Sequence, residues 1–117
     1  MKFLSLFVCL IISLTSCKHD VIVPDSPVIS FQNEVQPILV ANCTESGCHA
    51  SSGGEFPLVS YQDALSNVTP ENGRDSKLYK SITGKGESIM PPAPRPMLSD
   101  AAIRLIYIWI EQGAKNN

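Results

Sequence analysis

The stretch Asn42-Cys43-Thr44-Glu45-Ser46-Gly47-Cys48-His49 carries two cysteines separated by four residues, and a histidine follows the second cysteine directly. Thiols beside an imidazole form a ligand set for a metal or a cofactor, and the sequence Cys-x-x-Cys-His attaches c-type haem. Here the gap between the cysteines is four residues instead of two. Three kinds of site therefore compete for this segment: a haem site, a zinc site and a disulfide.

The chain has 117 residues, of which 44% are hydrophobic and 17% charged, with nine prolines and seven glycines. This composition predicts one globular domain with a modest core and a large share of loop. The formal net charge is −2. We expect no nucleic-acid partner, because a protein that binds a duplex needs a basic face.

Residues 1–16 are predicted to be a signal peptide for export. Met1-Lys2 supplies a positive start, and Phe3 to Leu14 is an apolar run broken only by Ser5 and Ser13. The run is too short to span a bilayer as a helix, which takes about 20 residues, and it fits a secretory signal. An uncleaved membrane anchor is the alternative.

The apolar run ends at Leu14-Thr15-Ser16-Cys17, which resembles the bacterial lipobox. In a lipobox, small residues precede a cysteine that is lipidated and becomes the mature N-terminus. We therefore expect lipid on Cys17 and a protein tethered to the bacterial cell envelope, on its periplasmic or cell-surface face. Ordinary cleavage after a small residue is the alternative. Residues 17–29, with Pro24 and Pro27, are predicted to be the lipidated N-terminus and an extended tether.

Only Cys43 and Cys48 remain for the domain, because Cys9 lies in the signal and Cys17 would carry lipid. A disulfide is plausible in an exported protein but leaves His49 unexplained. A structural zinc site needs four ligands, and this segment offers three. In a haem c site, the two cysteines form thioethers with the vinyl groups, and His49 is an axial ligand of the iron. Ser46 and Gly47 would give the longer bridge its freedom to bulge.

Helical patterns cover much of the domain, residues 30–117, and no stretch alternates with period two over enough residues to predict a sheet. Pro37 lies inside the first helix and should kink it or mark the start of its regular part. The last helix carries an apolar stripe of Ile103, Ile106, Tyr107 and Ile110. Leu105, Ile108 and Trp109 widen this apolar surface beyond that of a lone surface helix. The four predicted helices are 31–42 after the N-cap Ser30, 58–65 with the cap Ser60, 75–82 ended by Gly84, and 101–112 between the cap Ser99 and the stop Gly113.

The loop Met90-Pro91-Pro92-Ala93-Pro94-Arg95-Pro96 contains four prolines, which exclude a helix or a strand ladder. A haem iron used for electron transfer takes a second axial ligand, and a histidine–methionine pair raises its reduction potential. Met90 is the candidate second ligand because the prolines after it stiffen the backbone; an ordinary methionine contacting the core is the alternative. Met97 is predicted to pack in the core or as a hydrophobic staple at the start of the last helix.

The order of these motifs resembles the small class I cytochrome c domains of environmental bacteria. It is most similar to planctomycete-type cytochrome c domains and to single-domain cytochrome c lipoproteins of Bacteroidetes, over about residues 31–116. The resemblance implies an all-α cytochrome c fold, with N- and C-terminal helices packed across each other, short middle helices and a Pro-rich Met loop. It also implies one haem c, with thioethers from Cys43 and Cys48 and iron held by His49 and Met90. The four-residue gap departs from the family pattern. The quoted matches are Phe31…Val35-Gln36-Pro37-Ile38-Leu39…Asn42-Cys43…Cys48-His49, Met90-Pro91-Pro92 and Leu98-Ser99…Ile106…Trp109-Ile110-Glu111-Gln112-Gly113-Ala114.

We therefore expect an exported, lipid-anchored monohaem cytochrome that carries electrons to a transient redox protein partner and is not an enzyme. A haem enzyme or gas sensor with an open sixth position is one alternative. The other is a haem-free interaction domain with a Cys43–Cys48 disulfide. Tyr79, Lys85 and Arg95 are candidate partners of the haem propionates by chemistry alone.

Overall fold

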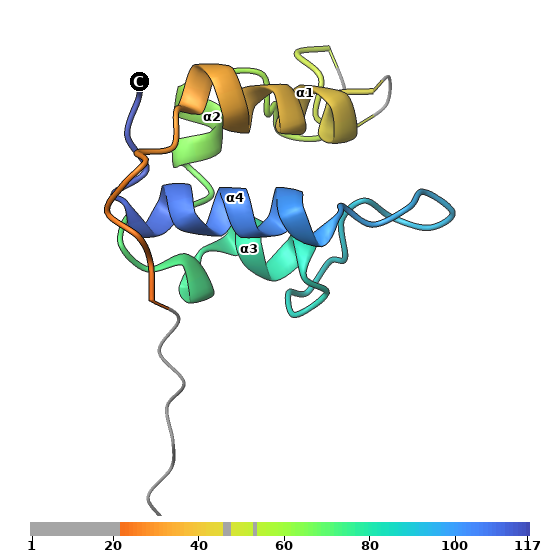
Figure 1. Ribbon diagram of the computed structural model, residues 1–117. Helices are drawn as coiled ribbons and strands as arrows, with labels where there is room; N and C mark the ends of the chain where they lie inside the picture. Colours follow the sequence, from red (N-terminus) through yellow and green to blue (C-terminus); the bar gives the residue numbers. More distant parts are fainter. Residues whose placement is uncertain (1–21, 46–47, 53) are drawn as a thin grey trace, which may run out of the picture.

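The computed structural model describes residues 22–45, 48–52 and 54–117, and every regular element in these ranges is helical. In the view of Figure 1, α1 and α2 lie above α4, and α3 lies below it. The predicted signal peptide, the lipidation site Cys17 and the bridge residues Ser46 and Gly47 fall outside the described residues. The elements are the π-helical turn η1 (Phe31–Val35), α1 (Gln36–Cys43), α2 (Tyr61–Leu65), the 3-10 turn η2 (Gly73–Asp75), α3 (Lys77–Ile82) and α4 (Asp100–Glu111).

The first helix begins as a wide turn and becomes regular only at Gln36. Ser30 is its N-cap, as predicted, and its hydroxyl accepts the Asn33 N–H at 3.2 Å. Pro37 has no N–H, and its ring would crowd the carbonyl four residues earlier in a regular helix. The wider π-turn moves that carbonyl away, and the Gln36 N–H donates to the Phe31 carbonyl instead. Pro37 therefore marks the start of the regular part, which is one of the two outcomes expected.

The core lies between the first helix and α4. The Phe31 ring is centred 5.3 Å from the Trp109 ring and 5.3 Å from the Tyr61 ring. On α4 the fully buried positions are Ile106, Trp109 and Ile110, whereas Ile103 and Tyr107 of the predicted stripe are half-buried. Ile108 is also buried, so the buried face of α4 includes the wider apolar surface predicted beside the stripe.

The two short middle helices were predicted, and their start and stop signals act locally. Ser60 and Asp63 form a capping box at the start of α2. α3 begins at Lys77, two residues later than predicted, because Gly73–Asp75 form a separate 3-10 turn. Gly84 and Gly113 have φ angles of 69° and 95°, which favour glycine at the ends of α3 and α4.

Residues 24–29, which belong to the predicted tether, lie against the end of α4. The Gln112 side chain donates to the carbonyls of Pro24 and Pro27 at 2.8 and 3.1 Å and accepts the Ile29 N–H at 2.8 Å. Ile29 is buried. The described part of this segment is therefore bound to the domain. No described helix is long and apolar enough to cross a membrane.

Candidate functional site

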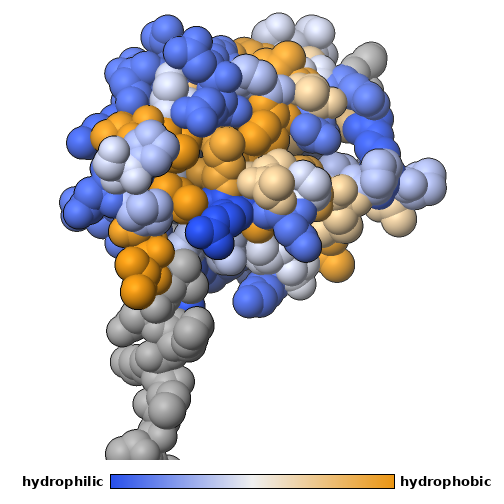
Figure 2. Space-filling model, viewed as in Figure 1, coloured by the Kyte–Doolittle hydropathy of each residue, from blue (hydrophilic) through white to orange (hydrophobic). Residues whose placement is uncertain are grey.

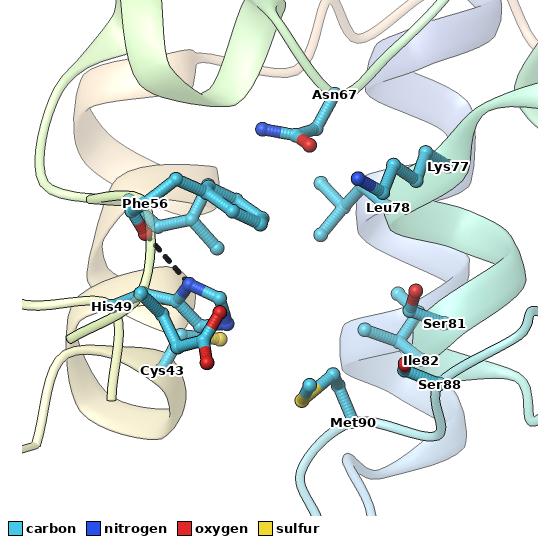
Figure 3. A pocket seen from close by; sticks show the side chains of 12 residues that line it. Cys43, His49, Phe56, Asn67, Lys77, Leu78, Ser81, Ile82, Ser88 and Met90 are labelled. Atoms are coloured by element: carbon cyan, nitrogen blue, oxygen red, sulfur yellow. Dashed lines mark hydrogen bonds between the residues drawn. The ribbon is translucent and has the colours of Figure 1, made fainter. Parts of the chain in front are cut away.

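A cavity of about 290 Å³ lies between the segment that follows α1 and the helix α3. Figure 3 shows Cys43, His49 and Phe56 on one side of it, with Leu78, Ile82 and Met90 on the other. The space-filling view shows apolar surface gathered in the middle of the face in view, with hydrophilic residues around it (Figure 2). The cavity thus lies between segments from the two halves of the chain, and most of its wall is apolar.

His49 is buried, and its ring is fixed by a backbone carbonyl. Nδ1 lies 2.7 Å from the Phe56 carbonyl oxygen, and the two rings are centred 4.5 Å apart. Because a carbonyl only accepts, Nδ1 of a neutral ring carries the proton, and Nε2 keeps its lone pair. Nε2 makes no hydrogen bond within the described ranges. Metal-bound histidines usually have one ring nitrogen oriented in this way.

Backbone hydrogen bonds set the position of His49 relative to α1. Its N–H donates to the Cys43 carbonyl at 3.0 Å, and its carbonyl accepts the Leu58 N–H at 2.8 Å. The first bond ties the histidine to the last residue of α1. The second ties it to the segment that carries Phe56, so the imidazole and its carbonyl partner are held together.

Cys43 and Cys48 are both free thiols in this structure, so it contains no Cys43–Cys48 disulfide. Cys43 is buried at the end of α1, and this burial, with a smaller contribution from the nearby Cys48, raises its pKa to about 11. Cys48 is half-buried, and Arg95 Nη1 donates a hydrogen bond to its sulfur at 2.7 Å. The two thiols therefore differ in accessibility and in surroundings.

Met90 is half-buried and lines the cavity on the side opposite His49 (Figure 3). Its N–H donates to the Ser81 carbonyl of α3 at 3.0 Å, and Pro91 after it is buried. Met97, in contrast, is 45% exposed, so it does not pack in the core, which was one of the two roles predicted for it. Leu98, the next residue, is the one buried at the start of α4.

A second hollow of about 270 Å³ shares Cys43, His49 and Met90 with the cavity and extends toward Cys48 and Arg95. Asn67 and Lys77 line the first cavity and are absent from this second hollow. The combined space therefore has two ends, one at Cys48 and Arg95 and the other at Asn67 and Lys77.

Several residues of the site were not found from the sequence. Lys77 lies over the Phe56 ring, with Nζ 5.2 Å from the ring centroid, and lines the cavity with Asn67. Tyr79 and Lys85, the predicted propionate candidates, line a different hollow beside Arg104. A lysine carries no signal in the sequence that separates a cavity position from a solvent position, so the sequence could not distinguish Lys77 from Lys85.

No group of three or more histidines, cysteines, aspartates and glutamates within the described ranges is placed to hold a metal ion. A haem iron has a different requirement, because it takes two protein ligands such as one imidazole and one thioether. Comparison of the chain with protein-family models, with curated proteins and with solved structures found no match. Function is therefore inferred from the cavity and its residues.

Proposed function

We propose that this protein is a c-type cytochrome that carries electrons by one covalently bound haem, held in the cavity between His49 and Met90. The observation that carries the proposal is the pairing across this cavity. An imidazole whose Nε2 has no hydrogen bond among the described residues faces a methionine thioether across the cavity. The free thiol of Cys43 lines the same cavity, and the free thiol of Cys48 lines the adjoining hollow.

The residues present fit this group. Cys43 and Cys48 would hold it by thioethers, His49 Nε2 would bind the iron, and the Met90 sulfur would fill the sixth position. When bound, haem c supplies a one-electron iron couple. The Phe56 carbonyl keeps the His49 ring oriented, and Leu78 and Ile82 exclude water from the opposite wall. With Met90 in the sixth position, small ligands are excluded, so electron transfer is favoured over catalysis.

The two ends of the space also fit the shape of haem. Its vinyl groups and its propionates lie toward opposite edges of the ring. The Cys48 end would take the vinyl edge. The opposite end would then take the propionates, where Lys77 offers a cation and Asn67 an amide. Arg95 lies at the Cys48 end and is therefore less suited to a propionate than Lys77.

The wider arrangement supports a cytochrome c fold, in which the N- and C-terminal helices pack across each other. Phe31 of the first helix and Trp109 of α4 are in contact, and the two short helices and the Met90 loop lie between these elements in the chain. We further propose export by the signal in residues 1–16, anchoring by lipid on Cys17 and a transient redox protein as partner. These proposals rest on the sequence.

Covalent haem is tested by producing the protein with a cytochrome c maturation system and extracting it with acidified acetone. We expect the pyridine haemochrome bands to stay with the protein. In the double variant Cys43→Ala, Cys48→Ala the haem should be extracted. A wild-type protein without a Soret band would contradict the proposal.

A further inference from the structure

Arg95 lies on the loop of Met90 and reaches the segment that carries Cys48 and His49. Its Nη1 donates to Cys48 Sγ at 2.7 Å, and its Nη2 lies 2.7 Å from Glu45 Oε2. One planar guanidinium thus contacts two residues of the segment 43–48, Glu45 and Cys48. A lysine, which has a single point charge, could not reproduce both contacts.

The Met90 loop is attached on either side of the methionine. At Met90, the backbone N–H is bonded to the Ser81 carbonyl of α3. Five residues later, the Arg95 N–H donates to the Pro92 carbonyl at 3.2 Å and closes a turn, from which the side chain reaches Cys48. Met90 therefore lies between one attachment to α3 and another to the segment on the opposite side of the cavity.

We propose that Arg95 is a positioning residue, whose guanidinium holds the Met90 loop against the Cys48 segment and so keeps the Met90 sulfur facing His49. Its consequence for the iron rests on the proposed function, because only then does a displaced Met90 open the sixth position. The Glu45 ion pair uses Nη2, whereas the Cys48 contact uses Nη1, so a thioether at Cys48 would remove no atom of the ion pair.

The strength of this attachment follows from its exposure. The side chains of Arg95 and Glu45 are 34% and 61% exposed, so solvent screens the pair, and such pairs contribute little individually. The proline-rich loop already has little conformational freedom to lose, which makes a modest contact sufficient to select one position. Removing Arg95 should therefore increase, by a factor of a few, the fraction of molecules in which the Met90 loop is detached from the Cys48 segment.

The first test uses the haem-free protein. Only Met90, Ala93 and Arg95 carry backbone amides within residues 90–96. In Arg95→Gln we expect the Met90 amide to exchange its hydrogen about fivefold faster than in the wild type. Arg104→Gln, which changes an exposed arginine of α4, is the matched control and should leave this amide unchanged. Equal Met90 exchange in the wild type and Arg95→Gln would overturn the proposal.

The second test uses the haem-loaded, reduced protein and carbon monoxide, which binds iron only when Met90 leaves. Arg95→Gln should bind carbon monoxide about fivefold more tightly than the wild type, with Glu45→Gln between them. The double variant should add less than the sum of the two, because both changes remove the same pair. Unchanged affinity in Arg95→Gln would overturn the positioning role. Wild-type protein without haem would instead overturn the proposed function, and the exchange test would still decide the attachment.

Discussion

At the scale of single residues, the site depends on how His49 and the two cysteines are surrounded. The Phe56 carbonyl holds one nitrogen of the His49 ring, and the other nitrogen has no hydrogen-bond partner among the residues that the structure describes. Cys43 is buried, whereas Cys48 is half-buried beside the Arg95 guanidinium. A buried thiol loses the solvation of its thiolate, which raises the pKa of Cys43.

This difference predicts unequal thiol reactivity in the haem-free protein. At pH 8, iodoacetamide should modify Cys43 at least about tenfold more slowly than Cys48, since burial raises the Cys43 pKa to about 11 and blocks access. Peptide mass spectrometry of a time course measures both rates. In urea the two rates should become similar. Equal rates in the folded protein would contradict this account of the two thiols.

The same thiol makes stability depend on pH. The folded pKa of Cys43, about 11, is higher than the value of about 8.5 expected for an unfolded cysteine. The resulting stabilisation is fully present below the unfolded pKa and is lost as the pH rises through the folded pKa. Cys43→Ala should therefore weaken the loss of stability between pH 8.5 and 11, as urea unfolding at a series of pH values would show.

At the scale of the elements, the local signals were predictable, and the packing of neighbouring elements was not. Ser30, Ser60 and Ser99 cap the helices that they were predicted to cap, because a cap bonds to N–H groups within three residues. The late start of α3 was missed, because the turn η2 is set by contact with α4. The Gly73 N–H donates to Glu111 Oε1 at 2.7 Å, across 38 residues of chain.

Gly73 gives a direct test of that packing. An added Cβ would lie 2.7 Å from the Tyr107 ring and 2.9 Å from Glu111 Oε1, which is too close without movement. Gly73→Ala should therefore lower the free energy of unfolding by about 1–3 kcal/mol, as measured by urea denaturation. Gly54→Ala is the control, since a Cβ there would meet nothing within 4 Å. Matching midpoints for the two variants would contradict the close packing of η2 on α4.

The same limit applies to the site. Cys43, His49 and Met90 could be selected from the sequence because each stands in a short motif, and the structure places all three around one cavity. The Phe56 carbonyl could not be selected, and Arg95 was predicted only as a candidate propionate partner and not as a contact of Cys48. A backbone oxygen has no signature in a sequence, and the Arg95–Cys48 contact joins residues 47 positions apart.

At the scale of the whole molecule, the two ends of the domain are joined. The Asn117 carbonyl accepts the Gln32 N–H at 3.0 Å and the Ser30 hydroxyl at 2.9 Å, and its side-chain carbonyl accepts the Phe31 N–H. Together with the Phe31–Trp109 contact, these bonds hold the first helix on α4. The junction does not border the cavity. It supports the first helix, whose last residue, Cys43, lines the cavity.

Phe31→Ala tests that support. Phe31 is 2% exposed, and its removal should lower the free energy of unfolding by about 3–5 kcal/mol. The chain has one tryptophan, Trp109, and Phe31 contacts it, so tryptophan fluorescence during urea unfolding reports on this core. Val40→Ala, at a position 46% exposed, is the control and should cost little. Similar losses in both variants would contradict a core centred on Phe31 and Trp109.

The central claim, an iron held between His49 and Met90, is tested most directly by the near-infrared spectrum of the oxidised, haem-loaded protein. We expect the weak band of methionine–iron ligation in the wild type, its loss in Met90→Ala and its persistence in Met97→Ala. Met97 is the matched control because it is exposed and does not line the cavity. An unchanged band in Met90→Ala would contradict the claim.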